Sequence, residues 1–166
     1  GEQLVYDMTT VFGFFPAEAL ANQVGLSTTP EQRALLEAPS DFLVDLTARP
    51  PRYWDPDRPQ LAEPMLLMLD RVTAFEPTGG GAGLGFARGE KDVNPGEWFF
   101  KAHFFQDPVQ PGSLGIEAMI QLLQWFMLHT GMDEGVSAPR FEAIATKLPM
   151  TWKYRGQVIP TNARIG

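Results

Sequence analysis

One apolar stretch, LGIEAMIQLLQWFML at residues 114–128, constrains the fold of this chain more than any other feature. Its apolar residues are spread around the whole circumference of a helix, and a helix that is apolar on all sides is buried. The exceptions are Glu117, Gln121 and Gln124, whose spacing places them on one face. We therefore expect a long buried helix over residues 113–129, with Ser113 as its N-cap and one narrow polar stripe.

The segments on both sides of this helix have the composition of β-strands. Strands are expected over residues 4–15, 85–93, 97–105, 141–154 and 156–166, and residues 65–77 are expected to form a short buried helix or strand followed by a strand. Residues 78–85, TGGGAGLG, are a turn whose spacing does not match a nucleotide-binding loop. Two short helices are expected earlier, over 16–24 and over 29–38, the second with a capping box of Thr29 and Gln32. This order predicts an α+β fold, an antiparallel sheet wrapped around the long helix.

Composition excludes several classes of protein. The chain has no cysteine, which excludes disulfides and thiolate sites and suits a cytoplasmic location. A formal charge of −7 argues against nucleic acid as a partner, and no apolar run approaches the roughly 20 residues that span a membrane. Residues 139–166 nevertheless carry a net charge of +4. This basic end is either a docking patch for an acidic partner or a set of scattered charges at strand edges.

Two polar residues occur where the pattern predicts apolar contacts, Glu117 in the helix and His103 in the run FFKAHFF. Glu117 could interact with the helix dipole, and His103 could be a core histidine bonded to the backbone. Both residues also suit a catalytic role. Burial of a carboxylate such as Glu117 costs free energy unless the group is protonated or paired, so a function would explain its position. His129, at the end of the helix, is expected only as a partner of the helix dipole.

The stretch WFFKAHFFQDPVQPGSLGIEAMIQLLQ, residues 98–124, closely resembles the active-site segment of FabA-like β-hydroxyacyl-acyl-carrier-protein dehydratases, which have the hot-dog fold. The wider context, including MLLMLDRVT and GLGFARGEKDVNPGE, resembles the dehydratase region of polyunsaturated fatty acid synthases and polyketide-type megasynthases. The resemblance implies that His103 is the catalytic base and Glu117 its acidic partner. Position 117 is usually Asp in the FabA subgroup and Glu in the FabZ subgroup, so isomerase activity stays open.

The resemblance also implies a substrate site around this pair. Gly112 matches the glycine whose N–H holds the thioester carbonyl, with Ser113 beside it, and Gln121 matches a polar residue one turn beyond the acid. The apolar walls of an acyl tunnel are expected from Phe104, Phe105 and Pro111. Dehydration needs a base for the α-proton and a protonated carboxyl for the β-hydroxyl, and an apolar helix favours the neutral carboxyl. No metal or other cofactor is implied, since the acyl chain arrives on the phosphopantetheine of an acyl carrier protein.

The resemblance further implies a modular organisation. Residues 1–15 would be the closing strand of a preceding hot-dog unit, 16–64 a helical and proline-rich linker, and 65–166 a dehydratase unit that lacks its last strands. We expect this unit to pair with a neighbouring hot-dog unit or with a second copy. The predicted function is dehydration of β-hydroxyacyl thioesters to trans-2-enoyl thioesters. The alternative is a non-catalytic hot-dog scaffold of the same synthase, and the histidine before the DPVQPG turn argues against a thioesterase.

Overall fold

The computed structural model describes residues 7, 9, 16–21, 29–144, 147–149, 152 and 156–166. The strand expected over residues 4–15 therefore lies outside the described residues, apart from positions 7 and 9. The helices and strands are, in chain order, α1 (Ala17–Ala21), α2 (Pro30–Glu37), β1 (Val44–Asp45), the 3₁₀ helix η1 (Pro51–Tyr53), β2 (Arg71–Glu76), β3 (Phe86–Asp92), α3 (Phe99–Ala102), α4 (Gly112–His129) and β4 (Arg164–Ile165).

The strands form one antiparallel sheet in the order β1-β2-β3-β4. β2 and β3 pair most extensively, with Val72 opposite Gly89 and an irregularity between Val72 and Ala74. Short β4 adds to the other edge of β3, where Ile165 lies opposite Lys91. A helix against an antiparallel sheet confirms the predicted α+β class, and the arrangement is that of a hot-dog fold.

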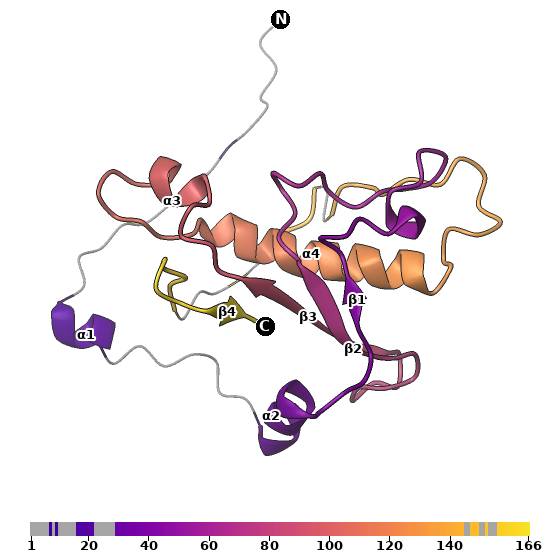
Figure 1. Ribbon diagram of the computed structural model, residues 1–166, viewed down its shortest axis with the longest axis horizontal. Coiled ribbons are helices and arrows are strands. Elements are labelled where there is room, and N and C mark those ends of the chain that lie inside the picture. Colours follow the sequence, from indigo (N-terminus) through magenta and orange to yellow (C-terminus); the bar gives the residue numbers. More distant parts are fainter. Residues whose placement is uncertain are drawn as a thin grey trace, which may run out of the picture.

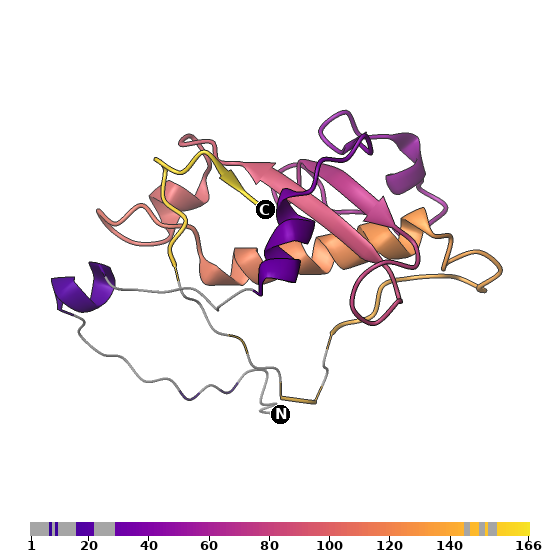
Figure 2. The same cartoon turned by 90° about the horizontal axis from the view of Figure 1, so that it is seen from below.

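Helix α4 lies across one face of this sheet (Figures 1 and 2), and β2 and β3 cross it obliquely. Its 18 residues confirm the long helix expected at this position. The predicted N-cap is wrong, because Ser113 lies inside the helix and Pro111 is the capping residue without a side-chain hydrogen bond. A proline disfavours the helical conformation in the residue before it, here Gln110, so the DPVQPG turn itself sets where α4 begins.

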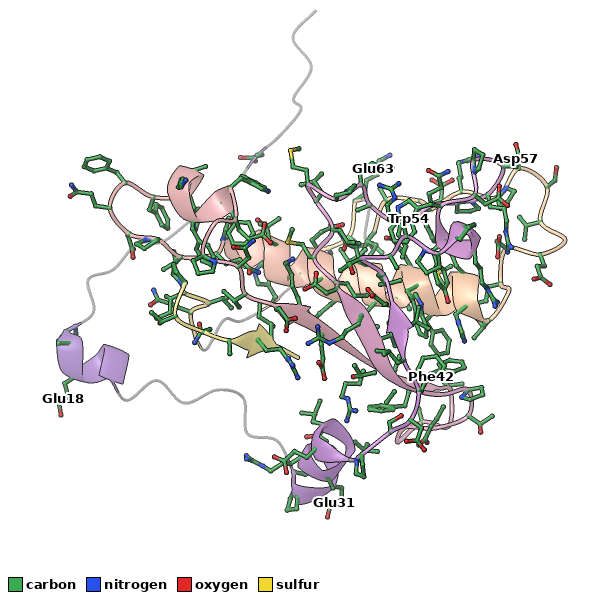
Figure 3. The ribbon with its side chains drawn as sticks, viewed as in Figure 1. Glu18, Glu31, Phe42, Trp54, Asp57 and Glu63 are labelled. Carbon is green, nitrogen blue, oxygen red and sulfur yellow. The ribbon has the colours of Figure 1, made fainter. Side chains whose placement is uncertain are left out.

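Two apolar clusters hold α4 in place. Its C-terminal half contributes Trp125 and Leu128 to a cluster with residues from the strands and from the proline-rich segment: Leu46, Tyr53, Leu61, Leu67, Leu69 and Val72. Its N-terminal half packs on a smaller cluster of Met68, Phe99 and Phe100. Figure 3 shows side chains gathered around the C-terminal half of α4, and the labelled Phe42 and Trp54 both pack against the first cluster.

Three predicted strands differ from the structure. Residues 97–105 contain helix α3 instead of a strand, because Phe99 and Phe100, adjacent in sequence, are both buried against Met68, which a strand would not allow. Within 141–154, the described residues lie outside helices and strands. Within 156–166, only Arg164–Ile165 is a strand. Strands over 71–76 and 86–92 and the capping box of Thr29 and Gln32 are confirmed.

His129 is not the charged partner of the helix dipole that its position suggested. Burial lowers the pKa of its imidazole, and the positive charge of Arg52 lowers it further. The ring stacks on Trp125 at a centroid distance of 4.5 Å, and its Nδ1 lies 2.8 Å from the Tyr53 hydroxyl. Arg52 instead provides the cation at this helix end, since its guanidinium donates to the carbonyl of His129.

Candidate active site

His103 occupies the end of helix α3, immediately before an exposed loop. Its backbone N–H donates to the carbonyl of Phe99 at 3.0 Å, so the histidine closes the single turn of α3. Its ring packs against Phe104, with 3.9 Å between ring centroids. The chain then turns through Gln106, whose φ of +58° lies in the left-handed region, and continues into the DPVQPG segment. This turn brings Val109 back towards the imidazole.

One hydrogen bond fixes which nitrogen of His103 is available. Nδ1 lies 3.1 Å from the carbonyl oxygen of Val109. A carbonyl oxygen only accepts, so the bond requires that Nδ1 carries a hydrogen. In the neutral ring, Nε2 then has the free lone pair and can act as a base. His103 is thus bonded to the backbone through Nδ1, as a structural histidine would be. Its Nε2 remains able to accept a proton.

Glu117 and Gln121 form a second unit one turn apart on α4. The side-chain amide of Gln121 donates to Glu117 Oε1 at 2.8 Å and to the carbonyl of Leu66 at 2.8 Å. Its Oε1 accepts from the backbone N–H of Met68 at 2.7 Å. Gln121 is fully buried, whereas Glu117 is half-buried. Gln121 therefore holds the carboxylate in one orientation against the segment that precedes β2.

His103 and Glu117 do not meet in the described part of this chain. No hydrogen bond or ion pair joins them there; the imidazole bonds to Val109 and the carboxylate to Gln121. Glu117 lies on α4 itself, whereas His103 lies on the segment before it. We call these two separate groups the glutamate half-site and the histidine half-site.

A cavity of about 460 Å³ lies beside the turn whose Val109 carbonyl binds His103, and neither His103 nor Glu117 is among its lining residues. It lies between the first three turns of α4, strands β3 and β4, and the 109–112 turn that binds His103. Most of its lining is aliphatic, and the lining on α4 consists of Gly112, Gly115, Ala118, Met119 and Leu122. This volume falls in the range of small-molecule sites. The walls are aliphatic, whereas the sequence suggested aromatic ones.

The other predicted site residues fall into two groups. Pro111 and Gly112 line the cavity, and Ser113 follows in the first turn of α4. Phe104 and Phe105 lie on the exposed loop after His103, where Phe105 is 90% exposed, and neither lines the cavity. Only Pro111 and Gly112 are thus brought to the cavity, whereas Ser113, Phe104 and Phe105 are exposed and do not line it.

The charges near the cavity are paired within the chain. Lys91, which lines it, is buried and its ammonium contacts Asp70 at 3.3 Å and Glu97 at 3.1 Å. In the basic C-terminal stretch, Arg140 pairs with Glu142, and Arg164 pairs with Glu90 and Asp92. The predicted docking patch is thus partly neutralised by its own neighbours.

Residues that sequence reasoning missed are Leu69, Gly89 and Leu122, which line the cavity where it lies furthest from the start of α4. Gly89 interrupts the side-chain alternation of β3, and this was the available signal.

Across the described ranges, no three His, Asp or Glu side chains are grouped so that they could hold a metal ion. The described helices are also too short or too polar to cross a membrane.

The fold defines an α+β protein of the hot-dog type with an apolar cavity beside its long helix. Comparison with known families agrees: residues 61–166 match the FabA-like domain. The match covers more than half of the chain, so the chain belongs to this family. At the general level, membership indicates a hot-dog dehydratase or isomerase of 3-hydroxyacyl thioesters.

Proposed function

We propose that this chain dehydrates β-hydroxyacyl thioesters to trans-2-enoyl thioesters, with His103 as base and Glu117 as acid. The observation that carries the proposal is the bond from His103 Nδ1 to the Val109 carbonyl, beside the cavity. It supplies an oriented basic Nε2, and family membership supplies the class of substrate. The resemblance of the sequence to polyunsaturated fatty acid and polyketide-type synthases supports the proposal that the reaction belongs to such a pathway.

The base step removes the α-proton. His103 Nε2 takes this proton, and the electron pair of the C–H bond moves towards the thioester carbonyl as an enolate. Helix α4 begins at Gly112, and its macrodipole gives positive potential at Gly112 and Ser113. An enolate oxygen placed at this end would be stabilised there. The helix start thus has the electrostatics that the base step needs.

The acid step expels the β-hydroxyl. The protonated carboxyl of Glu117 gives its proton to the leaving oxygen, the C–O bond breaks, and the enolate electrons form the double bond while water leaves. Gln121 orients the carboxyl through its amide N–H. The proton gained by His103 and the proton lost by Glu117 balance after exchange with solvent.

A second hot-dog unit is the proposed structural partner. The half-sites do not meet within the described part of one chain, and α4 leaves large apolar side chains exposed, including Met119 at 64% and Leu123 at 54%. Phe105 is exposed beside the histidine. A neighbouring unit or second copy that covers these residues would bring a base and an acid together.

The second proposed partner is an acyl carrier protein. Its phosphopantetheine would deliver the acyl chain, and no other cofactor is part of the proposal. Because Arg140 and Arg164 are paired within the chain, their contribution to docking an acidic carrier would be small. Tethering in one polypeptide would supply the encounter instead.

The test is turnover of a 3-hydroxydecanoyl thioester of pantetheine, followed by absorbance of the enoyl product. The wild-type chain is compared with His103→Ala and Glu117→Gln, and Glu134→Gln is the matched carboxylate control beyond α4. Loss of about 10²-fold or more in both site variants, with the control unchanged, supports the proposal. Folded wild-type protein without turnover, alone or mixed with carrier protein, would leave the scaffold alternative.

A further inference from the structure

Gly89 occupies the middle of β3 without a backbone reason for glycine. Its φ is not in the left-handed region, so any residue could adopt its conformation. Glycine weakens a strand interior and often marks a close approach by a side chain or ligand. Space is the reason here: a Cβ at position 89 would lie 2.5 Å from Leu69 Cδ1 and 3.2 Å from Leu122 Cδ1. Gly89 therefore makes room for the tips of two leucines.

These three residues lie together in the cavity wall. Leu69, Gly89 and Leu122 all line it, and Leu122 is the lining residue of α4 furthest from the helix start. The opposite end is the 109–112 turn, which binds His103 through the Val109 carbonyl. From Gly112 to Leu122 the helix axis rises about 15 Å. The lining thus extends from the 109–112 turn to a floor of leucine side chains, and His103 lies behind that turn without lining the cavity itself.

We propose that Leu69, Gly89 and Leu122 are the stop for the far end of the substrate's acyl chain, and that Gly89 sets the longest chain accepted. This rests on the proposed function, which places the thioester beside His103. An acyl chain that enters from there extends along Gly115 and Ala118, the small residues on the cavity face of α4. It ends where the leucine tips meet over Gly89.

The stop has a direct consequence for substituted chains. A side chain at position 89 would push the Leu69 and Leu122 tips into the cavity, because both contacts are with flexible methyl ends. The cavity would become shorter at its far end and stay unchanged beside His103. Removal of the Leu122 side chain would have the opposite effect and lengthen it. Selectivity should therefore shift in opposite directions for the two changes.

The first measurement is binding, which does not require turnover. Saturated butanoyl, octanoyl and dodecanoyl thioesters of pantetheine are titrated calorimetrically into wild type, Gly89→Ala, Gly89→Val and Leu122→Ala. Leu84→Ala is the control, since Leu84 is 81% exposed in the turn between β2 and β3 and does not line the cavity. Affinity in the wild type should rise about three- to fourfold for each methylene buried until the floor is reached.

We expect Gly89→Val to weaken the longest ligand that the wild type accommodates by tenfold or more, and to change butanoyl binding by less than about twofold. Gly89→Ala should show the same dependence of affinity loss on chain length, with smaller losses. The test therefore does not depend on whether the valine variant folds. Leu122→Ala should favour dodecanoyl, and Leu84→Ala should match the wild type. Equal changes at every chain length, or no change, would overturn the proposal.

Turnover of the corresponding 3-hydroxyacyl thioesters separates this proposal from the proposed function. If the folded wild type binds with the predicted dependence on chain length but produces no enoyl thioester, the dehydratase assignment fails and the acyl stop stands. If the wild type turns over all three substrates and the Gly89 and Leu122 variants leave the ratios of kcat/KM unchanged, the acyl stop fails and the assignment stands.

Discussion

Gln121 donates its side-chain amide to the carboxylate of Glu117 across one turn of α4, at 2.8 Å. The same glutamine is anchored on both sides by the backbone before β2, at the Leu66 carbonyl and the Met68 N–H. A fully buried amide with all these bonds has one orientation, so it holds the carboxylate to which it donates in one orientation as well. Through Gln121, the polar stripe of α4 thus links the helix to the segment 66–68.

Replacement of Gln121 by methionine should measure how much this link stabilises the fold, because methionine keeps the volume and removes the hydrogen bonds. The buried Met68 N–H would lose its partner, which costs roughly 1–3 kcal/mol of unfolding free energy. Gln124→Met is the control on the same stripe, since Gln124 is only half-buried and should change stability by less than about 0.5 kcal/mol. Denaturant titration of both variants gives the comparison. Equal stabilities would show that Gln121 does not brace the helix.

The sequence predicted this stripe but not its partners. Helical spacing alone placed Glu117, Gln121 and Gln124 on one face, because that spacing depends only on local geometry. The contact to residues 66–68 depends on how distant segments pack, and no local pattern contains it. The same limit explains Tyr53 and Leu61, which lie in the proline-rich segment expected to be a linker and yet are buried in the main apolar cluster.

The aromatic run around His103 shows a second limit. Aromatic residues have high strand propensity, and residues 97–105 were expected to extend as a strand. Their burial against Met68 and the start of α4 favours a single helical turn instead. The candidate residues His103 and Glu117 could still be named from the sequence, because a motif fixes identity at each position. Their separation into two half-sites could not, since it is a property of the packed chain.

The stability of the fold should depend on the protonation of His129. Burial and the nearby charge of Arg52 lower its pKa in the folded state, so the unfolded chain takes up this proton first as the pH falls. The stabilisation by neutral His129 is complete above the unfolded pKa of about 6.5 and is lost as the pH falls below it towards the folded pKa. His129→Phe keeps the stacked ring and removes the titration. Unfolding free energies of both proteins from pH 7.5 to 5 should diverge, and parallel curves would contradict this assignment.

Arg52 should be the main charge that acts on this histidine. Its guanidinium donates to the carbonyls of Leu128 and His129 at the C-terminus of α4. Arg52→Gln should raise the pKa of His129 towards its usual value and lower the unfolding free energy by about 1 kcal/mol. Arg49→Gln is the control, because Arg49 pairs with Glu63 instead. NMR titration of the imidazole protons measures the pKa, and an unchanged value in Arg52→Gln would show that burial alone lowers it.

The glycine-rich turn between β2 and β3 offers a matched pair of substitutions. Gly85 has a φ of +127°, and a Cβ there would lie 2.5 Å from Cζ of Phe126 on α4. Gly85→Ala combines an unfavourable backbone conformation with overpacking against a ring, and should reduce the unfolding free energy by about 1–3 kcal/mol. Gly81, four residues earlier, has open space around its Cβ position and no left-handed φ. Gly81→Ala should be neutral or stabilise by up to about 1 kcal/mol, because alanine reduces the entropy of the unfolded chain. If thermal unfolding gave the same midpoint for both variants, the turn would not be held against α4 through Phe126.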